Sequence, residues 1–160
     1  IHLMKSRISV GVLIFKDNKI LLIKHVHPKT GFTWWVPPGG GIKGTESIFE
    51  TAKREVFEET GMVVKLDKIV YIRQFLYYVQ EENNIIIYLT AKETKGKETI
   101  KNIKGKGIDE HYIKELCYFD KDGLKKQTVF PEILKGEMWK DYKKGFPSIK
   151  FIGVDTDRNK

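Results

Sequence analysis

The order of apolar and polar residues divides the first half of the chain into strands and one helix. Two segments rich in Val, Ile and Leu, "RISVGVLIF" (7–15) and "KILLIKH" (19–25), flank the turn signal "KDN" and predict a β-hairpin. A loop is expected next, with a short extended piece at 32–36. Its prolines and three consecutive glycines interrupt regular structure.

The ends of the following helix are marked by cap residues. Ser47 with Glu50 three residues later has the pattern of a capping box, and Gly61 has the place of a C-terminal cap. Beyond the helix, "VVKLDKIVYIRQFLYYV" (63–79) and "IIIYLTAKE" (85–93) have the composition of strands and flank the turn "EENN". We therefore predict a second hairpin here.

The second half of the chain begins with a polar segment rich in glycine and lysine, 94–107, which we predict to be a mobile loop or hairpin tip. "YIKELCYF" (112–119) predicts a strand, and "FPEILKGEMWKDYKKGF" (130–146) predicts a helix that starts near Pro131. "SIKFIGV" (148–154) predicts a last strand.

Mostly strands with one or two helices predict an α+β protein, an α/β/α sandwich with a mixed central β-sheet between helices. The 160 residues fit one domain, which we place at 4–154. Residues 1–3 are interpreted as a tag remnant and 155–160 as a C-terminal tail.

Composition narrows the class of protein. Hydrophobic residues make up 41% and charged residues 31% of the chain, as in soluble globular proteins. No apolar run approaches the roughly 18 residues of a membrane span, so we predict no membrane contact. Cys117 is the single cysteine, which excludes an internal disulfide and favours a cytoplasmic location.

The net charge of +8 has two interpretations. A basic surface attracts phosphates and nucleic acid, but scattered lysines also occur without any specific partner. Against this positive background, a local cluster of acids is conspicuous.

The segment "REVFEETG" (54–61) places three glutamates at the end of the predicted helix. Like charges three and four residues apart repel by about a few tenths of a kcal/mol per pair, and the helix macrodipole disfavours anions at this end. The apolar stripe of the helix consists of Ile48, Ala52 and Val56. At about 100° per residue, Glu55 and Glu59 fall on this same stripe and Glu58 lies beside it. We expect the acids to line the floor of a cleft.

Carboxylates crowded in a cleft stay ionised only if cations compensate them. Arg54 is one such cation, and a divalent metal ion is another. Mg²⁺ and Mn²⁺ both favour oxygen ligands. The alternative is an ordinary helix end whose acids pair with nearby lysines.

The residues around these acids carry a resemblance. Residues 40–62 read "GGIKGTESIFETAKREVFEETGM" and match the Nudix box, in which a Gly, a Glu and the sequence Arg-Glu-aliphatic-x-Glu-Glu-x-Gly stand at fixed spacing. The matching residues are Gly40, Glu46, Arg54, Glu55, Val56, Glu58, Glu59 and Gly61. The chain thus resembles the Nudix hydrolase family, including its MutT-like and ADP-ribose pyrophosphatase-like members.

This resemblance implies a metal-dependent hydrolase of a nucleoside diphosphate linked to another group. It implies that Glu55, Glu58 and Glu59 bind Mg²⁺ or Mn²⁺, with the backbone carbonyl near Gly39 or Gly40 as a further ligand. The substrates in this family include nucleoside triphosphates, nucleotide sugars, ADP-ribose and dinucleoside polyphosphates.

The resemblance also assigns supporting roles. Arg54 is expected to orient the glutamates and Glu46 to support that network. In this family the proton acceptor is often a glutamate of the helix or of a later loop, and Glu110 is the later candidate, as base or metal ligand, with Glu115 as its competitor.

Substrate contacts are predicted in the loop before the helix. Gly39, Gly40, Gly41 and Glu46 are candidates for binding the substrate. Of Trp34 and Trp35, alternation places one in the core and lets the other stack on a base.

Two other functions stay open. A non-catalytic Nudix-like module would bind a nucleotide or RNA and regulate a partner, but such modules tend to lose acids that are all present here. An isomerase of isoprenoid diphosphates needs a reactive Cys, and Cys117 lies in an apolar strand. The basic charge keeps an RNA 5′ end open as a candidate substrate. The segment 135–146 is a candidate contact in a homodimer or a helix that closes over the site, and core packing is the alternative.

Overall fold

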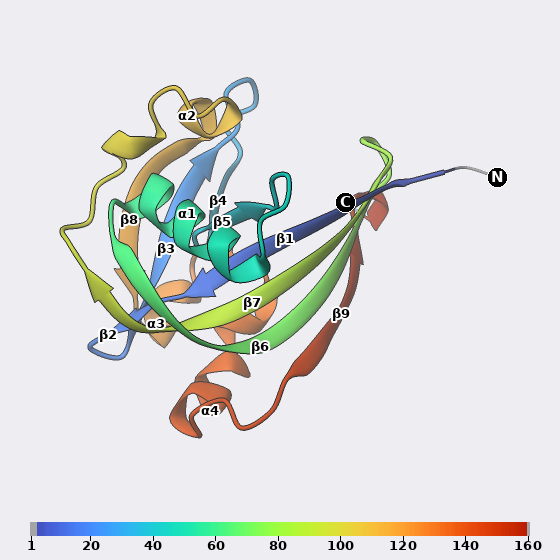
Figure 1. Ribbon diagram of the computed structural model, residues 1–160. Helices are drawn as coiled ribbons and strands as arrows, with labels where there is room; N and C mark the ends of the chain where they lie inside the picture. Colours follow the sequence, from blue (N-terminus) through green and yellow to red (C-terminus); the bar gives the residue numbers. More distant parts are fainter. Residues whose placement is uncertain (1–2, 160) are drawn as a thin grey trace.

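A computed structural model describes residues 3–159 as two β-sheets with helices against them (Figure 1). The five-stranded sheet has the order β5 (Gly39–Gly41), β1 (Lys5–Leu13), β7 (Glu82–Lys95), β6 (Val63–Tyr77), β9 (Lys150–Thr156). Strand β1 is parallel to β7 and β6 is parallel to β9, whereas the other two pairs are antiparallel. The sheet is therefore mixed, as predicted.

The second sheet has β3 (Lys19–Val26) at its centre. Its neighbours are β2 (Phe15–Lys16), β4 (Thr33–Val36) and β8 (Ile113–Phe119). The helices are α1 (Ile48–Thr60), α2 (Ile108–Tyr112), α3 (Lys121–Leu124) and α4 (Met138–Lys143), with 3₁₀ turns at Lys101–Ile103, Glu132–Lys135 and Asp157–Asn159. The α+β class is confirmed. None of the helices in residues 3–159 is long and apolar enough to cross a membrane.

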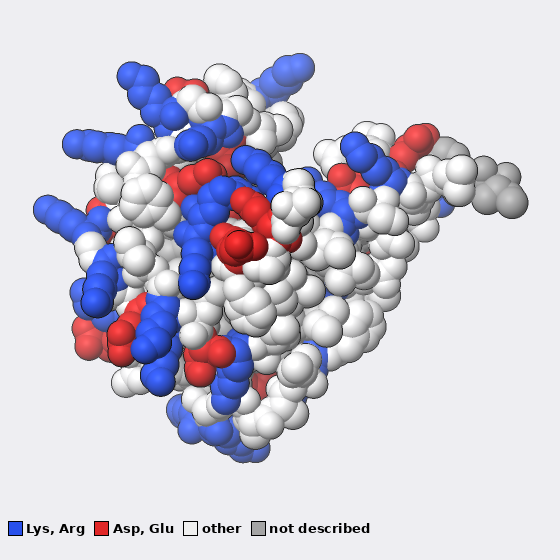
Figure 2. All heavy atoms as spheres, viewed as in Figure 1, with Lys and Arg blue, Asp and Glu red and all other residues white. Residues whose placement is uncertain are grey.

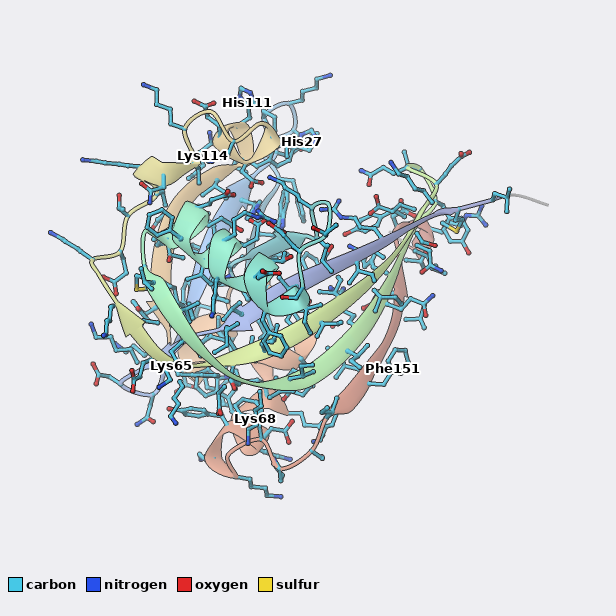
Figure 3. The ribbon with its side chains drawn as sticks, viewed as in Figure 1. His27, Lys65, Lys68, His111, Lys114 and Phe151 are labelled. Atoms are coloured by element: carbon cyan, nitrogen blue, oxygen red, sulfur yellow. The ribbon has the colours of Figure 1, made fainter. Side chains whose placement is uncertain are left out.

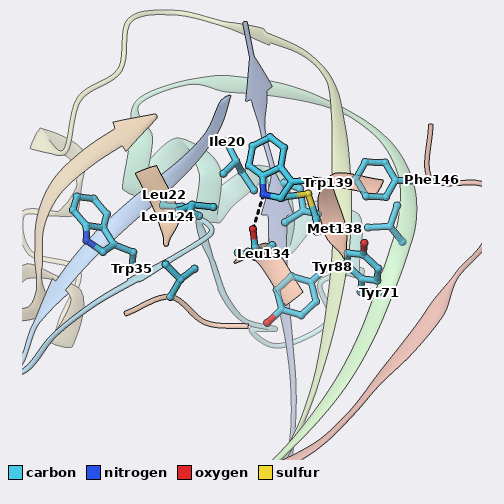
Figure 4. Packing of buried hydrophobic residues seen from close by; sticks show 13 residues of the cluster. Ile20, Leu22, Trp35, Tyr71, Tyr88, Leu124, Leu134, Met138, Trp139 and Phe146 are labelled. Atoms are coloured by element: carbon cyan, nitrogen blue, oxygen red, sulfur yellow. Dashed lines mark hydrogen bonds between the residues drawn. The ribbon is translucent and has the colours of Figure 1, made fainter. Parts of the chain in front are cut away.

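Alternate residues of β1 belong to two different cores. Val10 and Val12 pack with Ala52 and Val56 of α1, whereas Leu13 points to the opposite face. On that face a larger cluster includes Tyr71, Tyr88, Met138 and Trp139, and the indole of Trp139 donates a hydrogen bond to the carbonyl of Leu134 (Figure 4). Because side chains alternate along a strand, β1 contributes to both clusters. The central sheet thus has α1 packed on one face and α4 on the other.

The first predicted hairpin is wrong in its pairing. Residues 7–15 do not form one strand beside 19–25, since β1 pairs with β7 and β5, and only β2 pairs with the start of β3. Ile14, which is buried, lies where the chain passes from one sheet to the other. A run that is apolar on both faces is typical of a strand covered on both sides, which composition alone does not distinguish from half of a hairpin. The second hairpin is confirmed as β6 and β7.

The C-terminal half differs from expectation in three places. The helix predicted at 130–146 is a 3₁₀ turn and the short helix α4, separated around Gly136. The segment 94–107 packs on α1, because Thr99 donates a backbone hydrogen bond to Thr60 and Ile103 is buried. Strand β9 continues to Thr156, so the predicted tail 155–160 is largely part of the fold. Residues 1, 2 and 160, parts of the predicted remnant and tail, lie outside the described residues.

Helix α1 has the predicted caps at both ends. The Ser47 hydroxyl accepts from the Glu50 amide at 3.1 Å, and the Glu50 carboxylate accepts from the Ser47 amide at 2.7 Å. Gly61 closes the helix with φ 73°, in the left-handed region that favours glycine. These caps fix the length and orientation of the helix that carries the acidic residues.

We expect Ser47→Ala to lower the free energy of unfolding by about 1 kcal/mol, because an orphan amide of the first turn loses its acceptor. Urea unfolding monitored by circular dichroism measures this change. Glu50→Gln is the matched control, since glutamine also completes a capping box. Equal stability of Ser47→Ala and the wild type would contradict the role of the cap.

Candidate metal and nucleotide site

The C-terminal half of α1 directs two carboxylates under the glycine strand β5. Glu55 and Glu59 are 5% and 2% exposed, which is exceptional for acidic residues. The Gly39 amide donates a hydrogen bond of 3.0 Å to a carboxylate oxygen of Glu59. The predicted position of these acids on the apolar stripe corresponds to this burial.

The glycines of β5 permit this close approach of helix and strand. A Cβ on Gly40 would lie 2.4 Å from a carboxylate oxygen of Glu55. A Cβ on Gly39 would lie 2.0 Å from the carbonyl oxygen of Val10 in β1. Neither distance is sterically acceptable, so only glycine fits between β1 and the acids of α1.

Arg54 connects the acids of the helix to the preceding loop. Its guanidinium makes a bidentate pair with Glu46, at 2.7 and 2.9 Å, and donates at 2.6 Å to Glu55. It also donates to the Gly41 carbonyl at 3.1 Å. The pairing with Arg54, helped by hydrogen bonds from Thr51 and the Lys43 amide, lowers the pKa of Glu46 to about 2. Arg54 and Glu46 therefore fix the position of the Glu55 carboxylate.

A third carboxylate comes from a distant segment, and it is Asp109. One oxygen each from Glu55, Glu59 and Asp109 lie within 4.8 Å of one another. Glu110, the residue predicted from the sequence, instead accepts a hydrogen bond from the Gly105 amide at 3.0 Å. Among the described residues, the acidic group therefore contains Asp109 and not the predicted Glu110. Glu115 pairs with Lys24 at 3.2 Å.

Glu58 lies beside this group. Its carboxylate is 3.4 Å from the Arg54 guanidinium and 3.6 Å from the Lys106 ammonium. The helix thus presents Glu55 and Glu59 inward and Glu58 toward a basic loop. Figure 2 shows acids gathered over α1 with Lys and Arg side chains around them.

The three grouped carboxylates are electrostatically strained without a cation. Burial, and then the charge of Glu55, raises the pKa of Glu59 well above its usual range. Burial also raises the pKa of Glu55, against the opposing effect of Arg54, and raises the pKa of Asp109. One oxygen of Glu55 is buried without a hydrogen-bond partner in the described structure. Oxygen donors at this spacing, one of them unsatisfied, fit a hard divalent cation such as Mg²⁺ or Mn²⁺.

A cleft of about 710 Å³ opens over the acids. Its walls include Gly40, Glu55 and Asp109, and also four cations: Lys5, Arg7, Lys43 and Lys106. Positive side chains beside a group of carboxylates are suited to a ligand that carries phosphates.

An aromatic pocket of about 290 Å³ lies between β4 and β6. Trp34 stacks on His25 at 5.4 Å and on Phe32 at 5.5 Å between ring centroids, and it lines the pocket with Phe75 and Tyr77. His27 lies at the same end of the molecule as α2 (Figure 3), and its ring accepts from the amides of its own loop.

Trp35 has a different environment. It is 5% exposed, belongs to the large core cluster and donates to the Gln127 side chain at 3.1 Å. Trp34, its neighbour in β4, lines the aromatic pocket instead. Strand alternation therefore places Trp35 in the core, as predicted for one of the two residues, and base stacking by Trp34 stays a prediction.

Comparison with known proteins identifies the family. A model of the NUDIX domain matches residues 5–138, so the chain belongs to the NUDIX domain family. A probable DHNTP pyrophosphohydrolase of Lactococcus lactis subsp. cremoris (strain MG1363) is 30% identical over 69% of this chain and 54% of that protein. An 8-oxo-dGTP diphosphatase of Buchnera aphidicola subsp. Schizaphis graminum (strain Sg) is 29% identical over 72% of this chain and 83% of that protein.

Some relatives are considerably longer than this chain. Three curated relatives are matched over 33%, 54% and 37% of their lengths. Among solved structures, a NUDIX hydrolase from Nitrosomonas europaea superposes with a TM-score of 0.71 at 19% identity, covering 89% of this chain and 91% of that one. The MutT protein from Methanosarcina mazei Go1 has a TM-score of 0.67 at 20% identity, with 91% and 98% covered. At these identities the structures support the fold alone.

We expect the metal-free Glu59→Gln variant to be more stable than the wild type at pH 8. Because the folded pKa of Glu59 is raised, its contribution to stability is present below the unfolded pKa and is lost as pH rises toward the folded pKa. Glutamine removes this loss and keeps an acceptor for the Gly39 amide. The expected gain in melting temperature is roughly 3 °C, which corresponds to about 1 kcal/mol in a domain of this size.

The same thermal melts test cation binding. Mg²⁺ should raise the melting temperature of the wild type more at pH 8 than at pH 5.5, because binding requires ionised carboxylates. Glu59→Gln should lose most of this shift, whereas Glu50→Gln, which is outside the group, should keep it. An unchanged shift in Glu59→Gln would exclude Glu59 as a ligand.

Proposed function

We infer that this protein hydrolyses a diphosphate bond in a nucleotide, with Mg²⁺ or Mn²⁺ held by Glu55, Glu59 and Asp109. The observation that carries this proposal is the group of three carboxylates within 4.8 Å, in which one buried Glu55 oxygen has no partner among the described residues. Membership in the NUDIX domain family supports it. The two relatives compared above are named as a pyrophosphohydrolase and a diphosphatase.

A bound divalent cation would neutralise phosphate oxygens, orient the diphosphate for in-line attack and lower the pKa of water. The chain itself supplies the geometry. Arg54 and Glu46 hold Glu55 in place, and the predicted ligand Glu58 lies next to the group. The backbone of Gly40, whose carbonyl is the other predicted ligand, passes against the Glu55 carboxylate.

A carboxylate must also take the proton of the attacking water. The glutamates of α1 that the family resemblance offers for this step all lie in or beside the group of carboxylates: Glu55, Glu58 and Glu59. The cations of the cleft counter the charge of the phosphates, and the aromatic pocket around Trp34 offers stacking to a base.

The alternatives have less support. A regulatory module without catalysis would not need three carboxylates grouped in this way. An isomerase would need a reactive thiol, but Cys117 packs against the large core cluster and burial raises its pKa. The homodimer and the cytoplasmic location stay predictions from the sequence.

A substrate panel tests the proposed function. We expect the wild type with Mg²⁺ or Mn²⁺ to hydrolyse at least one member of a panel of (d)NTPs, 8-oxo-dGTP, ADP-ribose, nucleotide sugars, dinucleoside polyphosphates and capped RNA. Released phosphate, pyrophosphate or mononucleotide is measured. Glu59→Gln should be nearly inactive. No metal-dependent release from any compound, or full activity of Glu59→Gln, would reject the proposal.

The third ligand is tested with two adjacent acids. On the best substrate of the panel, we expect Asp109→Asn to lower kcat/KM at least about tenfold, which is the loss that even an outer contact of a metal site produces. Glu110→Gln should stay close to the wild type, because glutamine retains an acceptor for the Gly105 amide. The reverse result would restore Glu110 as the ligand.

A further inference from the structure

Arg7 is a cation of the cleft with an unusual position. It lies in β1 two residues before Ser9, which pairs with Gly41 in β5. Its guanidinium folds over that glycine, so that a Cβ on Gly41 would lie 2.9 Å from both Nε and one Nη of Arg7. Gly41 therefore leaves the space that the Arg7 side chain occupies.

Gly41 differs in this respect from the two glycines before it. Added Cβ atoms on Gly39 and Gly40 would meet a backbone carbonyl and the Glu55 carboxylate, respectively. On Gly41, the nearest atoms are all from the flexible end of Arg7. The fold itself could accept alanine at 41, but the guanidinium would then have to move.

The guanidinium of Arg7 makes no hydrogen bond within the described residues. Its charged neighbour is Glu82, at 3.7 Å, which is longer than the roughly 2.7–2.9 Å of a charge-assisted hydrogen bond. By contrast, Arg54 donates to three carboxylates and a carbonyl. Arg54 is thus held by the protein, whereas the Arg7 guanidinium, with a side chain 48% exposed, keeps its donors for another molecule.

Arg7 also lies between the two halves of the site. It lines the cleft together with Gly41 and Asp109. Glu82, the charged neighbour of Arg7, lies opposite Tyr77 in the pairing of β7 with β6, and Tyr77 lines the aromatic pocket. A nucleotide with its base on Trp34 and its diphosphate at the carboxylates would therefore pass Arg7 with its phosphates.

We propose that Arg7 binds the phosphate chain of the substrate through paired hydrogen bonds, and that Gly41 is glycine so that this guanidinium can reach the cleft. The planar fork of arginine matches two phosphate oxygens. This proposal rests on the proposed function for the identity of the substrate, but binding of phosphates by Arg7 can be measured without turnover.

Inorganic pyrophosphate in the presence of Mg²⁺ is the probe, because it carries phosphates and no base. Calorimetric titration should show affinity for the wild type, and Arg7→Ala should weaken it by about ten- to a hundredfold, the range of one hydrogen-bonded charge pair. Arg7→Lys should be intermediate. Lys65→Ala removes an equal charge from an exposed site at the far side of the molecule from α2 and His27 (Figure 3), and should change nothing.

Gly41→Ala gives the second measurement. It should weaken pyrophosphate binding to a similar degree, and the double variant should bind no more weakly than Arg7→Ala alone, because both changes remove the same contact. The shift of melting temperature with Mg²⁺ should persist in both variants, which shows that the carboxylate group is intact. If Gly41→Ala does not fold, the Arg7 variants alone decide the question.

Three results would overturn the proposal: no pyrophosphate binding by the wild type, wild-type affinity in Arg7→Ala, or losses in the two single variants that multiply. A panel without any hydrolysed substrate would reject the proposed function but would leave these binding data interpretable. On a substrate that is found, Arg7→Ala should raise KM more than it lowers kcat.

Discussion

The mutual repulsion of buried carboxylates is the constraint on which the site depends. Glu55 and Glu59 are held under β5 by covalent attachment to one rigid helix, and Arg54 compensates only part of their charge. Because Gly40 has no side chain, the backbone of β5 can pass directly against the Glu55 carboxylate. Folding therefore assembles a concentration of negative charge that a small divalent cation would relieve, and the hydrophobic contacts of α1 hold that arrangement in place.

The stability of this arrangement comes from the strand next to it. β1 contributes to both cores, and it pairs with the glycine strand on one side and with β7 on the other. The residues that position the carboxylates are thus fixed to a sheet covered on both faces. Sites on rigid elements keep their geometry better than sites on loops, and two of the three grouped carboxylates have such support.

The sequence was most informative where local chemistry determines structure. The cap residues Ser47 and Gly61 and the helical period correctly predicted α1 and the inward direction of Glu55 and Glu59, since these depend on neighbours within a few residues. The pairing of β1 was predicted wrongly, because apolar composition does not specify which strand a run will adjoin. Asp109 was missed for a related reason: two adjacent acids in a loop are equivalent in sequence, and only the path of the backbone decides which one turns toward the helix.

That path has an evolutionary consequence. Asp109 reaches the helix from a segment that contains Gly105 and Gly107, both with positive φ, and its neighbour Glu110 is tied to the Gly105 amide. Deleting one residue between Gly105 and Asp109 would bring Glu110 to the point that Asp109 occupies, with a side chain one methylene longer. Related proteins could therefore differ in the length of this segment and still present a carboxylate to α1. Alignment of the segment by sequence alone would then pair acids that do not occupy the same place in space.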